Sequence, residues 1–317
     1  NLVVYPHGAA ARRPGTTFVS EVADSDNKTR LIPFEFSTTQ TYMLEFSNLK
    51  IRFYKNNGII LEGNKTITGV TKASPGVITS NSHGYSNGDE VYISGIVGMT
   101  ELNGKTFLVV KIDANTFSLT DKDGVAINTT NFTTYSSAGT ANRVYEIATP
   151  YTTAELFDIK FAQSADVMYI THPSHEVEKL SRTGHTAWTL TNVDFGNGPF
   201  MDHNVETTTA NPSHKTVGST TTVTFSAVTG INNGAGFLST DVGRLVHIKD
   251  GHFKITSITS TTIVVGTVII DLGISSSTTT DFALGSFSNT SGFPSCVTFF
   301  EQRLVFAGTI AQPQTIF

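Results

Sequence analysis

The stretch HPSH places two histidines, His172 and His175, three residues apart, and His185 and His203 follow later in the chain. Histidines of this kind could hold a metal ion if carboxylates or a cysteine converged on them. Pro173 places the first pair in a turn, and no cysteine accompanies it. We therefore predict structural or solvent-exposed histidines and no metal site.

A second candidate for ion binding is the sequence Asp121-Lys-Asp123-Gly124, which is similar to the start of a calcium-binding loop. Such a loop needs a further Asp or Asn at its fifth position and a Glu at its twelfth. Here those positions hold Val125 and Phe132. The sequence therefore favours a hairpin turn at this point.

Two adjacent arginines, Arg12 and Arg13, precede Pro14-Gly15 and could contact phosphate. The alternative is a turn whose arginines pair with carboxylates of a neighbouring subunit. The chain has no Gly-x-Ser-x-Gly, no phosphate-binding loop and no zinc-protease helix motif. No pair of its 26 acidic residues stands out as a glycosidase pair, including the acid nearest the last strand, Glu301. We predict no catalytic and no cofactor-binding residues, no cofactor, and a protein that is not an enzyme.

Two single residues have ordinary structural interpretations. Cys296, the only cysteine, stands beside an apolar run and is expected to be a small buried hydrophobe, which also excludes an internal disulfide. Trp188, the only tryptophan, heads a predicted strand and is expected in the core instead of at a sugar-binding surface.

The composition indicates a β protein with little affinity for polyanions. Charged residues make up only 15% of the 317 residues, against about 25% in ordinary domains. Ser, Thr, Asn and Gly supply the polarity instead, and these residues suit sheet surfaces and turns. A net charge of −5 argues against broad capture of nucleic acid or of an anionic membrane. No run of about 18 apolar residues predicts a membrane-spanning helix.

Helical periodicity is nearly absent, and strand-length runs separated by turn residues fill the chain. We expect an all-β fold: a partial β-propeller-like platform interrupted by two inserted small β-barrel or sandwich domains. The predicted parts are the first propeller-like part (1–63), an inserted small β-barrel (64–143), a propeller-like blade (144–206), a second inserted β domain (207–288) and the start of a further blade (289–317). Because a radial array of sheets needs at least about four blades to close, we expect the chain to be a piece of a longer protein.

The predicted blade has four consecutive strands, at 157–163, 167–171, 177–182 and 187–195. Before it, Thr152 to Glu155 resembles a capping box and predicts one helical turn. Hairpin turns are predicted at Asn57-Gly58 and Asp250-Gly251, because both central positions of a type I′ turn need positive φ. An aromatic residue followed by Gln near a turn recurs at Phe36–Gln40, Phe161–Gln163 and Phe300–Gln302, which we interpret as the first hairpins of successive blades.

Three segments together resemble the tail nozzle proteins of short-tailed bacteriophages, also called tail tubular protein B. They are RRPGTTFVSEV (12–22), LFDIKFAQSADVMYITHPSHEVEKLSRTGHTAWTLTNVDFGNGPF (156–200) and FPSCVTFFEQRLVFAGTIAQPQTIF (293–317). DVGRLVHI (241–248) also recurs in that family. The segment around HGYSNGDEVYISG (83–95) looks like the small β-barrel module first described in ubiquitin-activating enzymes, which also occurs in phage tail proteins.

The resemblance covers about half of the chain and implies a virion structural protein. It implies a homo-oligomeric ring, six-fold in symmetry, that docks to an adaptor protein and to tail fibres or spikes. Phage DNA would pass through its lumen during ejection, without any insertion of the protein into a membrane. The ring would be assembled in the cytoplasm of the bacterial host and reside in the phage tail. The family offers no catalytic residues to transfer.

Two other functions stay open at this point. One is a receptor-binding or polysaccharide-cleaving tail spike or fibre, although the regular short-period repeat usual in spikes is not visible. The other is a carbohydrate-binding protein in which the inserted β domains would be the active part.

Overall fold

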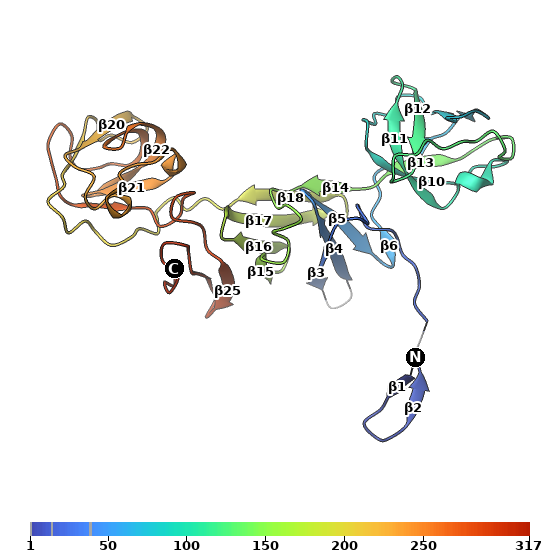
Figure 1. The fold of residues 1–317 in the computed structure, drawn as a ribbon, viewed down its shortest axis with the longest axis horizontal. Helices are drawn as coiled ribbons and strands as arrows, with labels where there is room; N and C mark the ends of the chain where they lie inside the picture. Colours follow the sequence, from blue (N-terminus) through green and yellow to red (C-terminus); the bar gives the residue numbers. More distant parts are fainter. Residues whose placement is uncertain (1, 14, 38–39) are drawn as a thin grey trace. The chain divides into compact units, whose positions relative to one another are not determined.

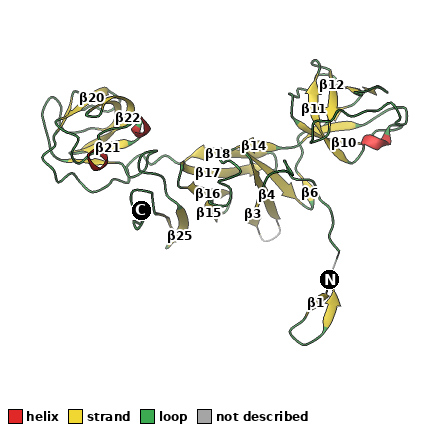
Figure 2. Cartoon of the chain, viewed as in Figure 1, coloured by secondary structure: helices red, strands yellow, loops and turns green. Residues whose placement is uncertain are grey.

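Strands and turns make up nearly all of this chain (Figures 1 and 2). The computed structural model describes residues 2–13, 15–37 and 40–317. Within these ranges the only helical elements are three short 3₁₀ turns: η1 (Thr100–Leu102), η2 (Asn232–Gly234) and η3 (Ser239–Asp241). The all-β prediction is confirmed. None of the described helices has the length and hydropathy needed to cross a membrane.

The chain divides into two compact units, residues 1–153 and 154–317. Unit 1 begins with a hairpin of β1 (Leu2–Val4) and β2 (Ala10–Arg12), whose side chains are largely exposed. Its next sheet has the order β14-β5-β4-β3, with β6 also paired to β5. These strands are β3 (Arg30–Ser37), β4 (Gln40–Ser47), β5 (Lys50–Lys55), β6 (Gly58–Ile59) and β14 (Glu146–Ala148). We call this sheet the host sheet of unit 1.

Alternation builds the core of this host sheet, because successive side chains of a strand point to opposite faces. The buried apolar side chains are Ile32, Phe34, Tyr42, Leu44, Phe46, Ile51 and Phe53. Strand β14 pairs with β5 and so belongs to this sheet, although its residues were predicted to lie in the blade that follows.

The predicted turn at Asn57-Gly58 is displaced by one residue. Lys55 pairs with Gly58, and the two central residues are Asn56 and Asn57, with φ of 52° and 59°. Asparagine tolerates the left-handed region well enough to take both central positions. The glycine is therefore left to begin β6.

A seven-stranded sheet follows, with the order β7-β13-β10-β11-β12-β9-β8. Its strands are β7 (Lys65–Thr66), β8 (Gly69–Val70), β9 (Val77–Thr79), β10 (Glu90–Ser94), β11 (Lys105–Lys111), β12 (Thr116–Thr120) and β13 (Thr140–Arg143). It encloses an apolar core that includes Ile78, Val91, Ile93, Phe117 and Leu119. We call residues 62–143 the first inserted domain.

Unit 2 opens with the four-stranded antiparallel sheet β15-β16-β17-β18, whose strands lie in chain order as in a propeller blade. They are β15 (Lys160–Ser164), β16 (Val167–His172), β17 (His175–Gly184) and β18 (Ala187–Asn192), within a few residues of the predicted ranges. Trp188 is 4% exposed, as predicted for a core residue. The predicted helical turn before the sheet is a series of turns over residues 153–158 that does not continue into a helix.

A hairpin of β25 (Cys296–Phe300) and β26 (Arg303–Ala307) packs on this sheet through an apolar cluster that includes Val177, Val297 and Phe306. Cys296 is exposed, so the prediction of a buried cysteine is wrong. The alternation of β25 buries its neighbour Val297 and turns the thiol outward.

The second inserted domain, residues 201–284, is a six-stranded sheet of order β19-β20-β23-β22-β21-β24. Its strands are β19 (Ala210–Pro212), β20 (Thr220–Phe225), β21 (Leu245–Ile248), β22 (Gly251–Ser260), β23 (Ile263–Ile270) and β24 (Phe282–Leu284). The turn predicted at Asp250-Gly251 lies one residue earlier in the structure: Ile248 pairs with Gly251, and Lys249 has φ of 52°. Gly251 instead serves close packing, because a Cβ there would lie 2.3 Å from the carbonyl oxygens of Ile270 and Asp271.

The three aromatic-Gln motifs do not occupy equivalent places. Gln163 lies in β15, ahead of the turn closed by the Ser164–Val167 pair. Gln302 lies inside its turn, with φ of 65°. The third motif spans residues 38–39, which lie outside the described residues, and its Gln40 pairs with Ser37 across them. The structure therefore does not support this motif as a repeat marker.

Candidate functional site

Each inserted domain is entered and left through a short paired neck. In unit 1, Leu61 and Val144 form a β-bridge, although 83 residues separate them in sequence. The amide of Tyr145 donates to the carbonyl oxygen of Ile60 at 2.9 Å. In unit 2, Phe200 and Gly285 form the corresponding bridge, and the amide of Met201 donates to the carbonyl oxygen of Leu284 at 2.8 Å.

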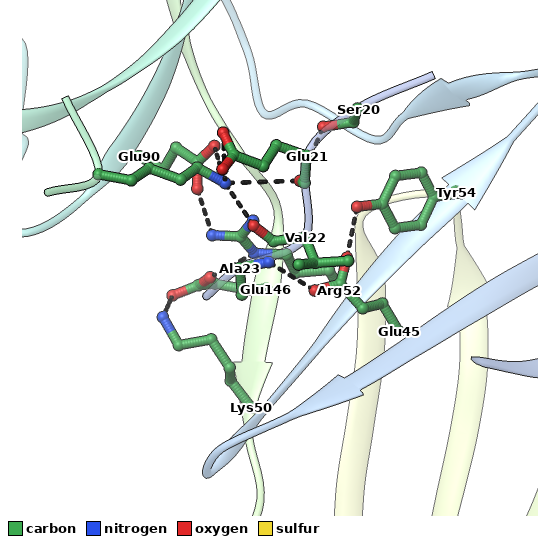
Figure 3. A network of polar contacts seen from close by, with 11 residues as sticks. Ser20, Glu21, Val22, Ala23, Glu45, Lys50, Arg52, Tyr54, Glu90 and Glu146 are labelled. Carbon is green, nitrogen blue, oxygen red and sulfur yellow. Dashed lines mark hydrogen bonds and ion pairs between the residues drawn. The ribbon is translucent and has the colours of Figure 1, made fainter. Parts of the chain in front are cut away.

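A buried group of charges lies where the first inserted domain meets its host sheet (Figure 3). Arg52 of β5 and Glu90, the first residue of β10, form an ion pair, and each side chain is 2% exposed. The Nε of Arg52 also lies 3.3 Å from Oε2 of Glu146 on β14. Lys122 of the inserted domain approaches Oε1 of Glu90 at 3.4 Å. We call Arg52, Glu90, Glu146, Lys122 and the neighbouring Glu45 the buried charge cluster.

The carboxylates of this cluster keep Arg52 charged. Burial lowers the pKa of Arg52, but the negative charges of Glu90, Glu146 and Glu45 outweigh that effect and raise it overall. Burial and the hydrogen bond to Glu45 raise the pKa of Tyr54, so its hydroxyl donates to that carboxylate. The cluster is a structural joint, since its ion pairs connect strands of the host sheet to the inserted domain.

The same cluster holds the segment that follows the N-terminal hairpin. The amide of Ala23 donates to Oε1 of Glu45 at 2.7 Å. The ammonium group of Lys122 donates to the carbonyl oxygens of Glu21 and Val22. Three parts of unit 1, namely the segment 20–23, the host sheet and the inserted domain, therefore meet at one set of charges (Figure 3).

The second inserted domain has its own buried arginine, in the stretch DVGRLVHI. Arg244 and Asp241 form an ion pair of 2.9 Å with both side chains fully buried. Arg244 Nη1 also donates to Oδ1 of Asn232 at 2.7 Å, and its Nε donates to the carbonyl oxygen of the neck residue Gly285 at 2.7 Å. Asp241 Oδ2 accepts from the amide of Leu238 at 2.9 Å. Through Arg244, the motif thus binds the neck strand at Gly285 from within the domain.

The histidines of HPSH lie directly opposite each other, His172 at the end of β16 and His175 at the start of β17. Their ring centroids are 5.0 Å apart. Nε2 of His175 lies 3.0 Å from Oε1 of Glu155, which comes from the turns before β15. The structure therefore adds a carboxylate to the predicted pair, and one possible ligand atom from each residue lies within 4.8 Å of the others.

The other candidate residues lie elsewhere. His185 is an exposed turn residue, and Nδ1 of His203 pairs with Asp281 at 2.7 Å in the second inserted domain. Asp121 closes a tight turn by accepting from the amide of Val125 at 2.8 Å, in agreement with the predicted turn. Arg12 lies at the end of β2; Pro14, within the turn predicted beside it, is outside the described residues.

Sequence reasoning missed the buried charge cluster and Glu155. Arg52 and Glu90 are 38 residues apart and stand in ordinary strand patterns, so no local signal connects them. A charged residue inside an alternating apolar strand, such as Arg52 between Ile51 and Phe53, was the signal available, because such a residue is buried only with a partner.

The comparisons with known proteins concern the first inserted domain. Residues 73–145 match the family described as the ubiquitin-activating enzyme E1 FCCH domain. The rabbit (Oryctolagus cuniculus) ubiquitin-like modifier-activating enzyme 1 is 39% identical over 79 residues, which are 24% of this chain and 7% of that protein. The matched region contains no cysteine, since Cys296 lies outside it.

Among solved structures, the phage phi92 endosialidase aligns with 89% of this chain and 53% of its own, at 12% identity and a TM-score of 0.18. A score this low does not indicate a shared fold. The chain spans 7% of the length of the curated relative and about half of the length of the solved structure.

Proposed function

We propose that this chain is a virion structural protein, a subunit of a ring-shaped tail nozzle of a short-tailed bacteriophage. The ring would dock to an adaptor protein and to tail fibres or spikes, and its lumen would pass DNA at ejection. Its location would be the phage tail, after assembly in the cytoplasm of the bacterial host. Its work would be mechanical, without a catalytic step.

The observation that supports this proposal best is the way in which both inserted domains are joined to the rest of the chain. Paired necks at Leu61–Val144 and Phe200–Gly285 let each domain fold on its own core, while the strands around the neck stay paired. The blade-like sheet of unit 2 carries the next hairpin on its face, as neighbouring blades of a propeller do. A platform with side modules suits a subunit that must contact several partners.

The use of charge agrees with a mechanical role. The most deeply buried ion pairs, Arg52–Glu90 and Arg244–Asp241, fix chain segments to one another. The net charge of −5 would also let DNA slide past a wall instead of binding to it.

Electron microscopy of negatively stained particles tests this proposal. The purified chain would be imaged alone and mixed with the adaptor protein from the same virion. A six-fold ring with a central hole, seen with the adaptor, is the expected result. Closed rings of this kind follow from cyclic symmetry with large repeated interfaces.

Two other outcomes would replace the proposal. Thin trimeric rods would indicate a tail spike, and polysaccharide cleavage would be assayed next. Specific binding on a glycan array, with no ring, would indicate a carbohydrate-binding protein whose inserted domains are the active part.

A further inference from the structure

The turn between β16 and β17 presents two imidazoles on one side of a β-ribbon. His172 and His175 flank the two-residue loop Pro173-Ser174 and form a directly opposed cross-strand pair. Opposed residues of an antiparallel pair have Cβ atoms about 4.5–5.5 Å apart and point to the same face. The ring centroids, 5.0 Å apart at an angle of 44°, agree with this placement.

A carboxylate completes the group from a different part of unit 2. Glu155 precedes β15, and its Oε1 lies 3.0 Å from Nε2 of His175. His172 is 3% exposed, whereas the side chains of His175 and Glu155 are 23% and 25% exposed. The group therefore has a buried inner side, formed by His172, and an open side through which an ion from solvent could enter.

Two imidazoles and one carboxylate are a ligand set that zinc accepts, with further positions left to water. We propose that Glu155, His172 and His175 form a binding site for a divalent transition-metal ion, with Zn²⁺ as its first candidate. The ion would tie the β16–β17 turn to the segment before β15, which the contact between His175 and Glu155 already links.

The protonation state of His172 fits a metal ligand. Burial, followed by the neighbouring His175, lowers the pKa of His172, so its ring is neutral at pH 7. A histidine that binds a metal ion must do so as the neutral imidazole. The nearby carboxylates of Glu155 and Asp158 favour a cation at this place.

One present contact would have to change. The amide of Ser174 donates to Nδ1 of His172 at 3.2 Å. Coordination through Nδ1 replaces this bond with the ion, and coordination through Nε2 moves the ring proton to Nδ1. In both cases the Ser174 amide loses its acceptor, which provides a local readout that is independent of any activity.

The test is zinc titration of the whole 317-residue chain after EDTA treatment and dialysis, at pH 7.5, by calorimetry. We expect saturable binding of about one Zn²⁺ per chain. The Ser174 amide resonance should move during the same titration. Co²⁺ in place of Zn²⁺ should give visible absorption bands typical of mixed nitrogen and oxygen ligands.

Three variants decide whether these residues are the ligands. His175→Ala and Glu155→Gln should each weaken Zn²⁺ binding by at least about tenfold, since even outer-shell partners of metal ligands contribute that much. His185→Ala, an exposed histidine between β17 and β18, is the matched control and should bind as the parent does.

Failure of the folded parent chain to bind Zn²⁺ would overturn the proposal, and so would equal binding by all three variants. Circular dichroism of each variant shows whether it is folded, and Glu155→Gln keeps the size and hydrogen-bonding ability of its side chain. The result is independent of ring formation, so the nozzle proposal and the metal proposal succeed or fail separately.

Discussion

The two inserted domains use a buried arginine in different ways. In the first, Arg52 belongs to the host sheet and reaches across to Glu90 on the first long strand of the inserted domain. In the second, Arg244 belongs to the inserted domain and turns back onto the neck, where it donates to the carbonyl oxygen of Gly285. The first arginine thus joins two sheets, and the second closes one domain on itself.

This difference explains why one arginine stands in a recognisable motif and the other does not. Asp241 and Arg244 are three residues apart, so their pairing is local and the stretch DVGR contains both partners. Gly243 between them has φ of 90°, which only glycine adopts readily. Arg52 and Glu90 depend on the relative position of two sheets, and no short sequence can encode that.

The largest effect is expected from Arg244→Met. The change leaves Asp241 as a charged, fully buried group without its cation, and such a loss costs about 3–5 kcal/mol of unfolding free energy. Urea unfolding, monitored by the hydrogen exchange of peptides from residues 201–284, would measure the loss of unfolding free energy. Arg303→Met, at an exposed arginine of β26, is the control and should change stability by less than about 0.5 kcal/mol. A cost for Arg244→Met as small as the control's would mean that the motif does not hold the neck.

A smaller effect is expected from Glu90→Gln. Arg52 loses its closest carboxylate but keeps Glu146 and Glu45, so the cost should be about 1–3 kcal/mol, typical of a buried group left partly unsatisfied. Increased hydrogen exchange should appear both in β5 and in β10, because the pair joins two sheets. Glu21→Gln, at the half-exposed edge of the cluster, is the control. Exchange that rises in β10 alone would argue against the joint.

Acid should destabilise the second inserted domain more than the first. Burial, and then the nearby His203, lowers the pKa of His247 on β21 from its ordinary value of 6.5; Asp281, Asp250 and His252 also act on it. A histidine whose pKa is lower in the folded state takes up its proton more readily when unfolded. The stability that depends on its neutral form is therefore complete above about pH 6.5 and falls as the pH drops below that value.

In the first inserted domain the lowered pKa values belong to carboxylates, Glu101 and Asp113, whose ordinary values are 4.5 and 3.8. The stability linked to these groups is lost only at a pH below those values. Between pH 7.5 and 5.5, hydrogen exchange should therefore rise more in residues 201–284 than in 62–143. His247→Gln should remove most of that rise, and an equal rise in the variant would assign the acid sensitivity to other groups.

The sequence was sufficient for the features that depend on neighbouring residues. Alternation with a period of two predicts strands such as β16 and β18 closely, and the density of turn residues separates the inserted domains from the longer strands of the blade. Turn register was harder, because both asparagine and glycine accept positive φ, and the residue pairs at Asn57-Gly58 and Asp250-Gly251 were each one residue late.

Features made by distant residues could not be predicted. The neck pair Leu61–Val144 and the approach of Glu155 to His175 bring together residues whose spacing carries no signal. Histidine and carboxylate are common residues, so their convergence is visible only once the turn between β16 and β17 and the segment before β15 are both placed. The predicted burial of Cys296 is wrong for another reason: apolar neighbours in the sequence do not show which face of a strand a residue occupies.

The smallest effect is expected at the neck of the first inserted domain. Arg143 is paired with Glu62 at 2.7 Å and with Asp89 at 3.1 Å, but the arginine and Glu62 side chains are about one-third exposed. Ion pairs in such contact with solvent contribute about 0.2–1 kcal/mol, so Glu62→Gln should lower the unfolding free energy by no more than that. High salt should reduce the difference between parent and variant, whereas it should leave the effect of Glu90→Gln nearly unchanged, because a buried pair is screened much less. A cost for Glu62→Gln equal to that of Glu90→Gln would place the joint at the surface of the neck instead of in the buried charge cluster.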